Sequence, residues 1–171
     1  MSDLSISWPG YKTDSVSEEE VDRPAVKIAV PERSKVLHAF GDEMTVLLSG
    51  ADTGGQLAMC LDVTPPGGGP PPHYHLHEEE WFFPLEGEVA FFLNGEWRAV
   101  AVGTAVFVPR GTVHTFRNSG SEPLKMLVQT TPAGFETFFE HCAGEFAKPG
   151  PPDMGRIMEI SEEHGIHFVT E

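Results

Sequence analysis

The chain has 171 residues, of which 40% are hydrophobic, and this is enough for one domain with a hydrophobic core. Its formal net charge of −15 at pH 7 argues against binding to nucleic acid or to an anionic membrane surface, because both partners are negatively charged. No apolar run reaches the length of a membrane span, and no basic segment followed by an apolar core opens the chain. We therefore expect a soluble, cytoplasmic protein.

Residues 1–35 are predicted to form an N-terminal extension. The segment is polar, with an acidic run at residues 18–20, and we expect it to be partly flexible. Residues 25–30 read Ala-Val-Lys-Ile-Ala-Val, a pattern that is typical of a strand. This strand has no obvious partner among the core strands, and sheet edges accept added strands. We therefore expect residues 26–30 to pair with a neighbouring subunit in a homodimer.

Residues 36–131 contain many short apolar runs separated by turn signals, with no amphipathic helical pattern. Asn94 and Gly95 stand between two of these runs, and this dipeptide is typical of a tight β-hairpin. The even spacing of the short strands predicts an all-β sandwich or jelly roll. Because no internal repeat is visible, we expect one barrel over this region.

Residues 132–171 show a different period and are predicted to form a C-terminal helical tail. Five apolar residues fall on one helical stripe: Phe135, Phe138, Phe139, Cys142 and Phe146. Residues 154–165 favour a second helix, and no element is predicted for the residues after it. We expect the stripe of phenylalanines to pack against the barrel.

Four residues at suitable spacings form a candidate metal site. His73 and His75 are two residues apart, so on a strand they share one face, and Glu80 follows. His114 lies in an alternating stretch behind a turn at residues 109–111, and a neighbouring strand can bring it to the other two histidines. Three imidazoles and one carboxylate suit a single divalent transition metal, which can be Fe, Ni, Mn, Co, Cu or Zn.

The spacing alone leaves a second ligand set open. His77 lies on the same face as His75 if the strand is regular, whereas a bulge or turn after His75 would remove it. The shifted set is then His75, His77 and Glu80. Glu78 and Glu79 are expected to be solvated charges. The remaining histidines are expected to be structural or exposed: His38, His141, His164 and His167.

Together, the two segments resemble the two motifs of the cupins. The matching positions are Gly67, His73, His75, Glu80 and Gly87 in the first motif, and Gly103, Pro109, Gly111, His114 and Asn118 in the second. The resemblance implies a double-stranded β-helix (jelly-roll) barrel over residues 36–131, in a single-domain protein with one or two C-terminal helices. It also selects His73 and His75 as ligands, leaves His77 at the rim, and implies association into dimers.

Among the cupins, the chain resembles the quercetin-type dioxygenases, which implies a metal-dependent dioxygenase. The substrate would be a small aromatic or enolic molecule, because Phe82, Phe91, Phe107 and Phe116 offer candidates for an apolar wall. Glu80 would be the catalytic residue as well as a ligand, taking a proton from a bound hydroxyl. Two alternatives stay open, because a fold does not fix a function. One is a metal-dependent isomerase or lyase acting on a sugar or keto acid, and the other is a non-catalytic cupin that binds a small molecule.

Overall fold

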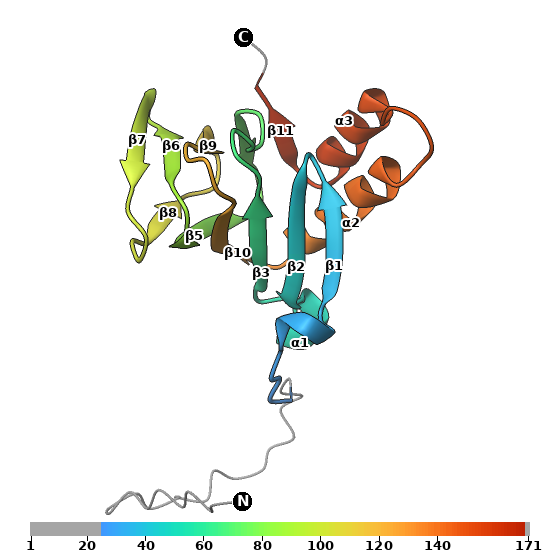
Figure 1. Ribbon diagram of the computed structural model, residues 1–171. Coiled ribbons are helices and arrows are strands. Elements are labelled where there is room, and N and C mark those ends of the chain that lie inside the picture. The colour runs from blue at the N-terminus through green and yellow to red at the C-terminus, as the bar shows by residue number, and fades with distance from the viewer. Residues whose placement is uncertain (1–24, 170–171) are drawn as a thin grey trace, which may run out of the picture.

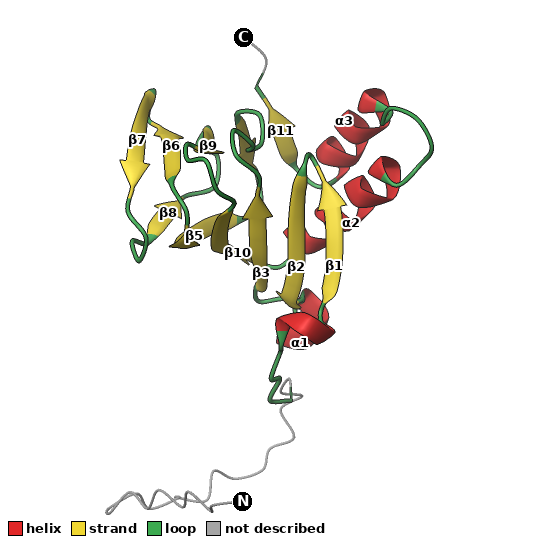
Figure 2. Ribbon diagram, viewed as in Figure 1, coloured by secondary structure: helices red, strands yellow, loops and turns green. Residues whose placement is uncertain are grey.

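The computed structural model describes residues 25–169, which form two antiparallel β-sheets with helices beside them (Figures 1 and 2). In spatial order, the six-stranded sheet comprises β1 (Lys35–Ala39), β2 (Asp42–Leu48), β3 (Ala58–Thr64), β10 (Leu124–Thr131), β5 (Glu79–Glu86) and β8 (Val106–Val108). The five-stranded sheet comprises β11 (Ile166–Phe168), β4 (His73–His75), β9 (His114–Asn118), β6 (Val89–Leu93) and β7 (Glu96–Val100). The predicted all-β jelly roll is confirmed.

Alternating burial defines the inner face of the six-stranded sheet. Every second residue of β3 and β10 is buried, which is the pattern of a strand with one face toward a core. Val128 of β10 lies between Cys60 of β3 and Phe82 of β5, so their side chains form one inward row. The two sheets enclose a core of buried apolar residues: Phe82, Val89, Phe91, Val106, Val108, Phe116, Leu124, Met126 and Val128.

Two glycine-containing turns shape the barrel. Asn94 and Gly95 both have positive φ, 53° and 84°, and join β6 to β7 in the predicted hairpin. Gly69 has φ 143°, and a Cβ at this position would lie 2.1 Å from the carbonyl oxygen of Phe116. The glycine- and proline-rich segment before β4 therefore lies directly on β9, where a larger residue would force it away.

The short helices are η1 (Pro31–Arg33) and α1 (Gly50–Thr53), and the C-terminal helices are α2 (Phe135–Phe146) and α3 (Met154–Glu163). Both C-terminal helices lie at the β1 side of the molecule, away from β6 and β7 (Figure 1). The predicted stripe of α2 is buried at Phe138, Phe139 and Cys142, in a cluster that also contains residues of β1 and α3.

After α3 the chain forms the strand β11, for which the sequence carries no clear signal. This strand pairs with β4, so Ile166 lies opposite His75 and Phe168 opposite His73. Three residues carry too little periodicity to mark a strand. These three residues form a strand because they pair with the edge of β4.

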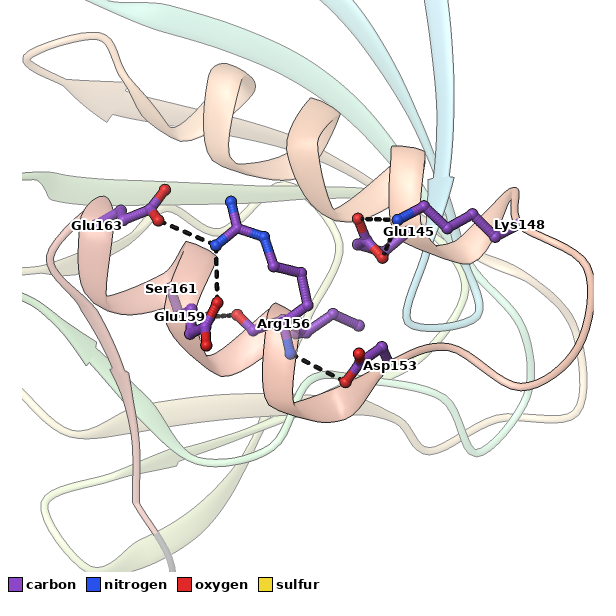
Figure 3. A network of polar contacts seen from close by, with 8 residues as sticks. Glu145, Lys148, Asp153, Arg156, Glu159, Ser161 and Glu163 are labelled. Atoms are coloured by element: carbon purple, nitrogen blue, oxygen red, sulfur yellow. Dashed lines mark hydrogen bonds and ion pairs between the residues drawn. The ribbon is translucent and has the colours of Figure 1, made fainter.

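Polar contacts fix the ends of the C-terminal helices (Figure 3). Asp153 caps α3 by accepting a hydrogen bond from the backbone N–H of Arg156 at 3.1 Å. The Arg156 side chain donates to Glu159 and Glu163, and Lys148 donates to Glu145 at the end of α2. These contacts are exposed, so the buried apolar side chains, rather than the ion pairs, hold the helices on the barrel.

Residues 25–30 form no strand within the protomer. The side chains of Val26 and Ile28 are 95% and 84% exposed. Pairing of this segment with a neighbouring subunit therefore stays a prediction. The flexibility predicted for the start of the extension concerns residues 1–24, which lie outside the described residues.

Candidate metal centre

The two sheets contribute different parts of the centre. Both histidines of β4 are buried on its inner face, and His73 lies directly opposite His114 of β9 in the five-stranded sheet. Glu80 comes from β5 in the six-stranded sheet. Closure of the barrel brings together one ligand atom from each of these four residues, and all four atoms lie within 4.8 Å of one another.

Each histidine is oriented by a group outside the cluster. The Nδ1–H of His73 donates to the carbonyl oxygen of Pro71, and the Nδ1–H of His114 donates to that of Thr112, each at 2.9 Å. A carbonyl oxygen only accepts, so both rings carry a proton on Nδ1 and can offer the lone pair of Nε2. His75 is flanked instead by Glu78, whose Oε2 lies 3.4 Å from Nδ1. Such outer partners are typical of metal-binding histidines.

The donor atoms fit a cation between them. Nε2 of His114 lies 3.0 Å from Oε2 of Glu80, and Nε2 of His75 lies 3.6 Å from the same oxygen. Two atoms that both present lone pairs approach this closely only with a proton or a cation between them. Both ring nitrogens of His75 are buried without a hydrogen-bond partner among the described residues. His73, His75, Glu80 and His114 would therefore hold one divalent transition metal.

Burial and neighbouring charges set the protonation of the centre. Burial, with His114 and His75 nearby, lowers the pKa of His73 to about 3. Burial alone would raise the pKa of Glu80, but the adjacent His75 and His114 outweigh it and lower this pKa. Burial lowers the pKa of His75, but the carboxylates of Glu80 and Glu78 outweigh burial, so the pKa of His75 is raised overall. The carboxylate of Glu80 is therefore ionised and available as a ligand near neutral pH.

His77 lies outside the cluster. Its side chain is exposed, and a Cβ added at Gly165 would lie 2.5 Å from His77 Cδ2, so the ring rests on this glycine. The alternation stops at the end of β4, so the structure does not bring together the shifted set of His75, His77 and Glu80.

The prediction for Glu78 is wrong. Its side chain is buried rather than solvated, because the turn after β4 directs it back toward His75. Glu79 is partly exposed and lies 3.5 Å from Arg110 in an ion pair.

The centre opens on a cavity in which the centre of a water-sized sphere can move through about 50 Å³. Its walls come from both sheets and from α2: Phe40, Asp42, Met44, Asp62, Pro70, His73, Glu80, Phe82, Phe116, Val128, Phe135, Phe138, Phe139, Ile166 and Phe168. Of the four predicted wall residues, Phe82 and Phe116 line it, and Phe91 is buried in the core behind it. Phe107 is the candidate that does not face inward. Its position in the alternation of β8 leaves it 48% exposed, next to Trp81.

Part of the aromatic wall comes from the C-terminal segments, where the sequence predicted only packing of the helix and no element after residue 165. Phe135, the first residue of α2, has its ring centroid 5.7 Å from that of His75. Phe168 of β11 lies 6.1 Å from His73 by the same measure. The phenylalanine stripe was visible in the sequence, but only its contact with the barrel shows that one edge faces the cavity.

Two carboxyl groups in the cavity wall were also missed. Asp42 and Asp62 are 6% and 2% exposed, although neither forms an ion pair within the described residues. Burial raises the pKa of Asp42 to about 6, and burial together with Asp42 raises the pKa of Asp62 to about 8. The sequence did carry a signal for Asp62, because this acidic residue stands at an inward position of the alternating strand β3.

The remaining histidines and both cysteines are not part of the cluster. His38 is exposed, and His141 and His164 form a hydrogen bond with each other at 3.0 Å. The ring of His167 stacks on Tyr74. Cys60 and Cys142 are buried, and both are free.

The fold and the site define a class of protein: a jelly-roll barrel with three imidazoles and one carboxylate facing one another between its two sheets. Comparison with known families agrees, because residues 61–130 match the Cupin domain. The chain therefore belongs to the cupins.

Two relatives of known name cover most of this chain. Quercetin 2,3-dioxygenase of Bacillus subtilis is 31% identical over 129 residues, which are 75% of this chain and 36% of that protein. Polyketide synthase CurC of Streptomyces cyaneus is 29% identical over 126 residues, which are 73% of this chain and 81% of that protein. The chain thus spans about a third of the length of the dioxygenase.

Solved structures share the fold. A predicted oxalate decarboxylase from Thermotoga maritima has a TM-score of 0.58 at 23% identity and covers 62% of this chain and 99% of its own. The polyketide cyclase RemF from Streptomyces resistomycificus has a TM-score of 0.55 at 24% identity and covers 63% of this chain and 80% of its own. Within residues 25–169, no helix has both the length and the apolar character of a membrane span.

Proposed function

We propose that this cupin is a metal-dependent dioxygenase that acts on a small aromatic or enolic substrate. The observation that carries the proposal is a buried cluster of three histidines and one glutamate at the wall of a cavity lined with phenylalanine. The similarity to quercetin 2,3-dioxygenase of Bacillus subtilis supports the choice of reaction. When bound, a divalent transition metal supplies Lewis-acid and redox chemistry at this position.

The side chains of the cavity perform the remaining tasks. Glu80 is ionised and lies in the cavity wall beside the histidines, so it can accept a proton from a substrate hydroxyl at Oε1 or Oε2. The rings of Phe82, Phe116 and Phe135 exclude water and hold a planar molecule by stacking. A cavity of about 50 Å³ favours a substrate smaller than a flavonol.

A metal-dependent isomerase or lyase is the second candidate, and one observation favours it. Asp42 and Asp62 place two further groups that can exchange protons in the cavity, and proton transfer within a substrate needs no oxygen. A sugar or keto acid would be its substrate.

Oxygen uptake distinguishes the two candidates. Metal content and oxygen consumption are measured together across a panel of enols, flavonols and sugar acids. We expect oxygen to be consumed only when a small enol or phenol is present. Conversion of a substrate at the same rate under nitrogen would instead establish the isomerase or lyase, and binding of a panel member without conversion would indicate a binding protein.

The role of Glu80 as a base has its own test. Glu80→Gln should retain part of the metal, because an amide oxygen can still coordinate, but it should lose most turnover because an amide accepts no proton at neutral pH. Wild type and variant are loaded with the same metal before oxygen uptake is followed. Full activity in the metal-loaded variant would remove the base role.

A further inference from the structure

Asp42 and Asp62 lie side by side at the inner face of the six-stranded sheet. Asp42 begins β2, and Asp62 is the cross-strand partner of Met44 on β3. The Thr64 hydroxyl donates to Oδ2 of Asp62 at 2.9 Å. Oδ1 of each aspartate is buried without a hydrogen-bond partner among the described residues. Each carboxyl group thus keeps an unused acceptor, and both residues line the cavity.

A structural role does not explain these acceptors. Within residues 25–169, no lysine, arginine or histidine forms an ion pair with either aspartate. Asp62 lies opposite the apolar Met126 on the adjoining strand β10, and the charge of Glu80 on β5, which also acts on Asp62, is negative. A buried carboxyl group without partners costs stability, and such a cost persists where the group has a function.

The aspartates and the histidine–glutamate cluster border the same cavity at different positions. Asp62 lies opposite Met126 on β10, whereas Glu80 lies opposite Thr130, four residues further along that strand. Apolar rings, including Phe82 and Phe139, complete the cavity wall. The cavity therefore has two polar positions and otherwise mostly apolar walls.

We propose that Asp42 and Asp62 form a second polar end of the substrate cavity and accept a hydrogen bond from a substrate hydroxyl, while another oxygen of the substrate lies at the histidine–glutamate cluster. This inference rests on the proposed function in one respect, namely that a small organic molecule occupies the cavity. It narrows the substrate class to small molecules with an aromatic or enolic centre and a second, neutral hydroxyl. A carboxylate at that end would lie against Asp42, which is ionised near neutral pH, and would be repelled by it.

Binding under nitrogen tests the inference without turnover. The probes are phenol, resorcinol and 3-hydroxybenzoate, titrated into the metal-loaded protein in a calorimeter. We expect resorcinol to bind roughly tenfold more tightly than phenol, because its second hydroxyl gains a hydrogen bond to a carboxylate, and 3-hydroxybenzoate to bind more weakly than phenol. In Asp62→Leu the preference for resorcinol over phenol should vanish. Glu43→Gln, an exposed change on β2 beside Asp42, is the matched control and should keep the preference.

Melting temperature and metal content provide a second readout. Asp62→Leu should melt no lower than wild type with the same metal content, because removal of a buried carboxyl group without an ion pair offsets the loss of its hydrogen bond from Thr64. A lower melting temperature or a loss of metal in this variant would show a structural role and overturn the inference. So would equal affinities of wild type for phenol and resorcinol, including the absence of binding by either. Oxygen uptake, which tests the proposed function, is a separate measurement, so each proposal can fail alone.

Discussion

At the scale of single residues, Glu78 differs from the other groups that orient the histidines because it carries a charge. Pro71 and Thr112 present backbone carbonyls to His73 and His114, whereas His75 has only the carboxylate of Glu78 beside its Nδ1. A carboxylate in this position fixes the ring and raises its basicity toward a metal.

Replacing Glu78 should therefore weaken metal binding without removing a ligand. We expect Glu78→Gln to lower metal affinity by about tenfold, at the lower end of what such outer partners contribute. Competition with a chelator of known affinity measures the change. Glu79→Gln is the control, since Glu79 pairs with Arg110 away from the centre, and equal affinities of the two variants would contradict this role.

The two buried aspartates should make stability depend on pH. The pKa of Asp62 rises from an unfolded value of about 3.9 to about 8, so the folded state binds more protons between these values. The stability that protonated Asp62 contributes is complete below pH 4 and is lost as the pH rises through 8. Asp42, with a pKa of about 6, acts in the same direction. The other polar or titratable groups that face Asp62 are Cys60, Thr64 and Glu80, and none is a cation at these pH values.

Melting curves at pH 5.5 and pH 8 test this dependence in wild type and in Asp62→Asn. The variant should lose less stability over this interval, by about 1 kcal/mol or more, which corresponds to roughly 2–4 °C in melting temperature. Because both proteins keep the same metal ligands, the comparison cancels any effect of pH on metal binding. Identical slopes would show that Asp62 does not titrate in this range.

At the scale of elements, α2 closes the cavity. Phe135, Phe138 and Phe139 lie along one edge of this helix and contribute to the cavity wall, while Phe135 also lies next to His75. The helix thus limits the size of the cavity.

Shortening Phe135 should enlarge the cavity at the metal centre. We expect Phe135→Ala to raise the rate of oxygen uptake with a flavonol relative to a small enol by several-fold, because the larger molecule then gains access. Its stability cost should be less than the roughly 3–5 kcal/mol of a fully buried phenylalanine, since Phe135 is only partly buried. Phe107→Ala removes an exposed ring outside the cavity and should leave this ratio unchanged.

The elements also show what the sequence could and could not predict. The strands, the hairpin at Asn94 and the meeting of His73, His75, Glu80 and His114 were predictable, because alternation and motif spacing are local signals. Three features could not be predicted from the sequence: the strand β11, the burial of Glu78 and the inward edge of α2. Each of them depends on contacts that the chain makes only after folding. The aspartate pair falls between these cases, since alternation marks Asp62 as inward but does not show that it lines a cavity.

At the scale of the whole molecule, we propose that the protein is a homodimer joined through residues 26–30. Val26 and Ile28 are almost fully exposed in the protomer, and exposed apolar side chains next to a sheet edge are typical of an interface. We expect sedimentation velocity to show a dimer at micromolar concentration. The double variant with Val26→Asp and Ile28→Asp should be a monomer, whereas Val102→Asp, an exposed change elsewhere, should stay dimeric. A monomeric wild type would contradict the proposal.

The central claim is that one metal ion is held by His73, His75, Glu80 and His114. Elemental analysis of purified wild type, His114→Ala and His77→Ala tests it most directly, because both variants lose an imidazole but only one of these rings lies in the cluster. We expect about one transition-metal ion per chain in wild type and in His77→Ala, and a sharp loss in His114→Ala. Equal metal content in the two variants would contradict the assignment of the centre.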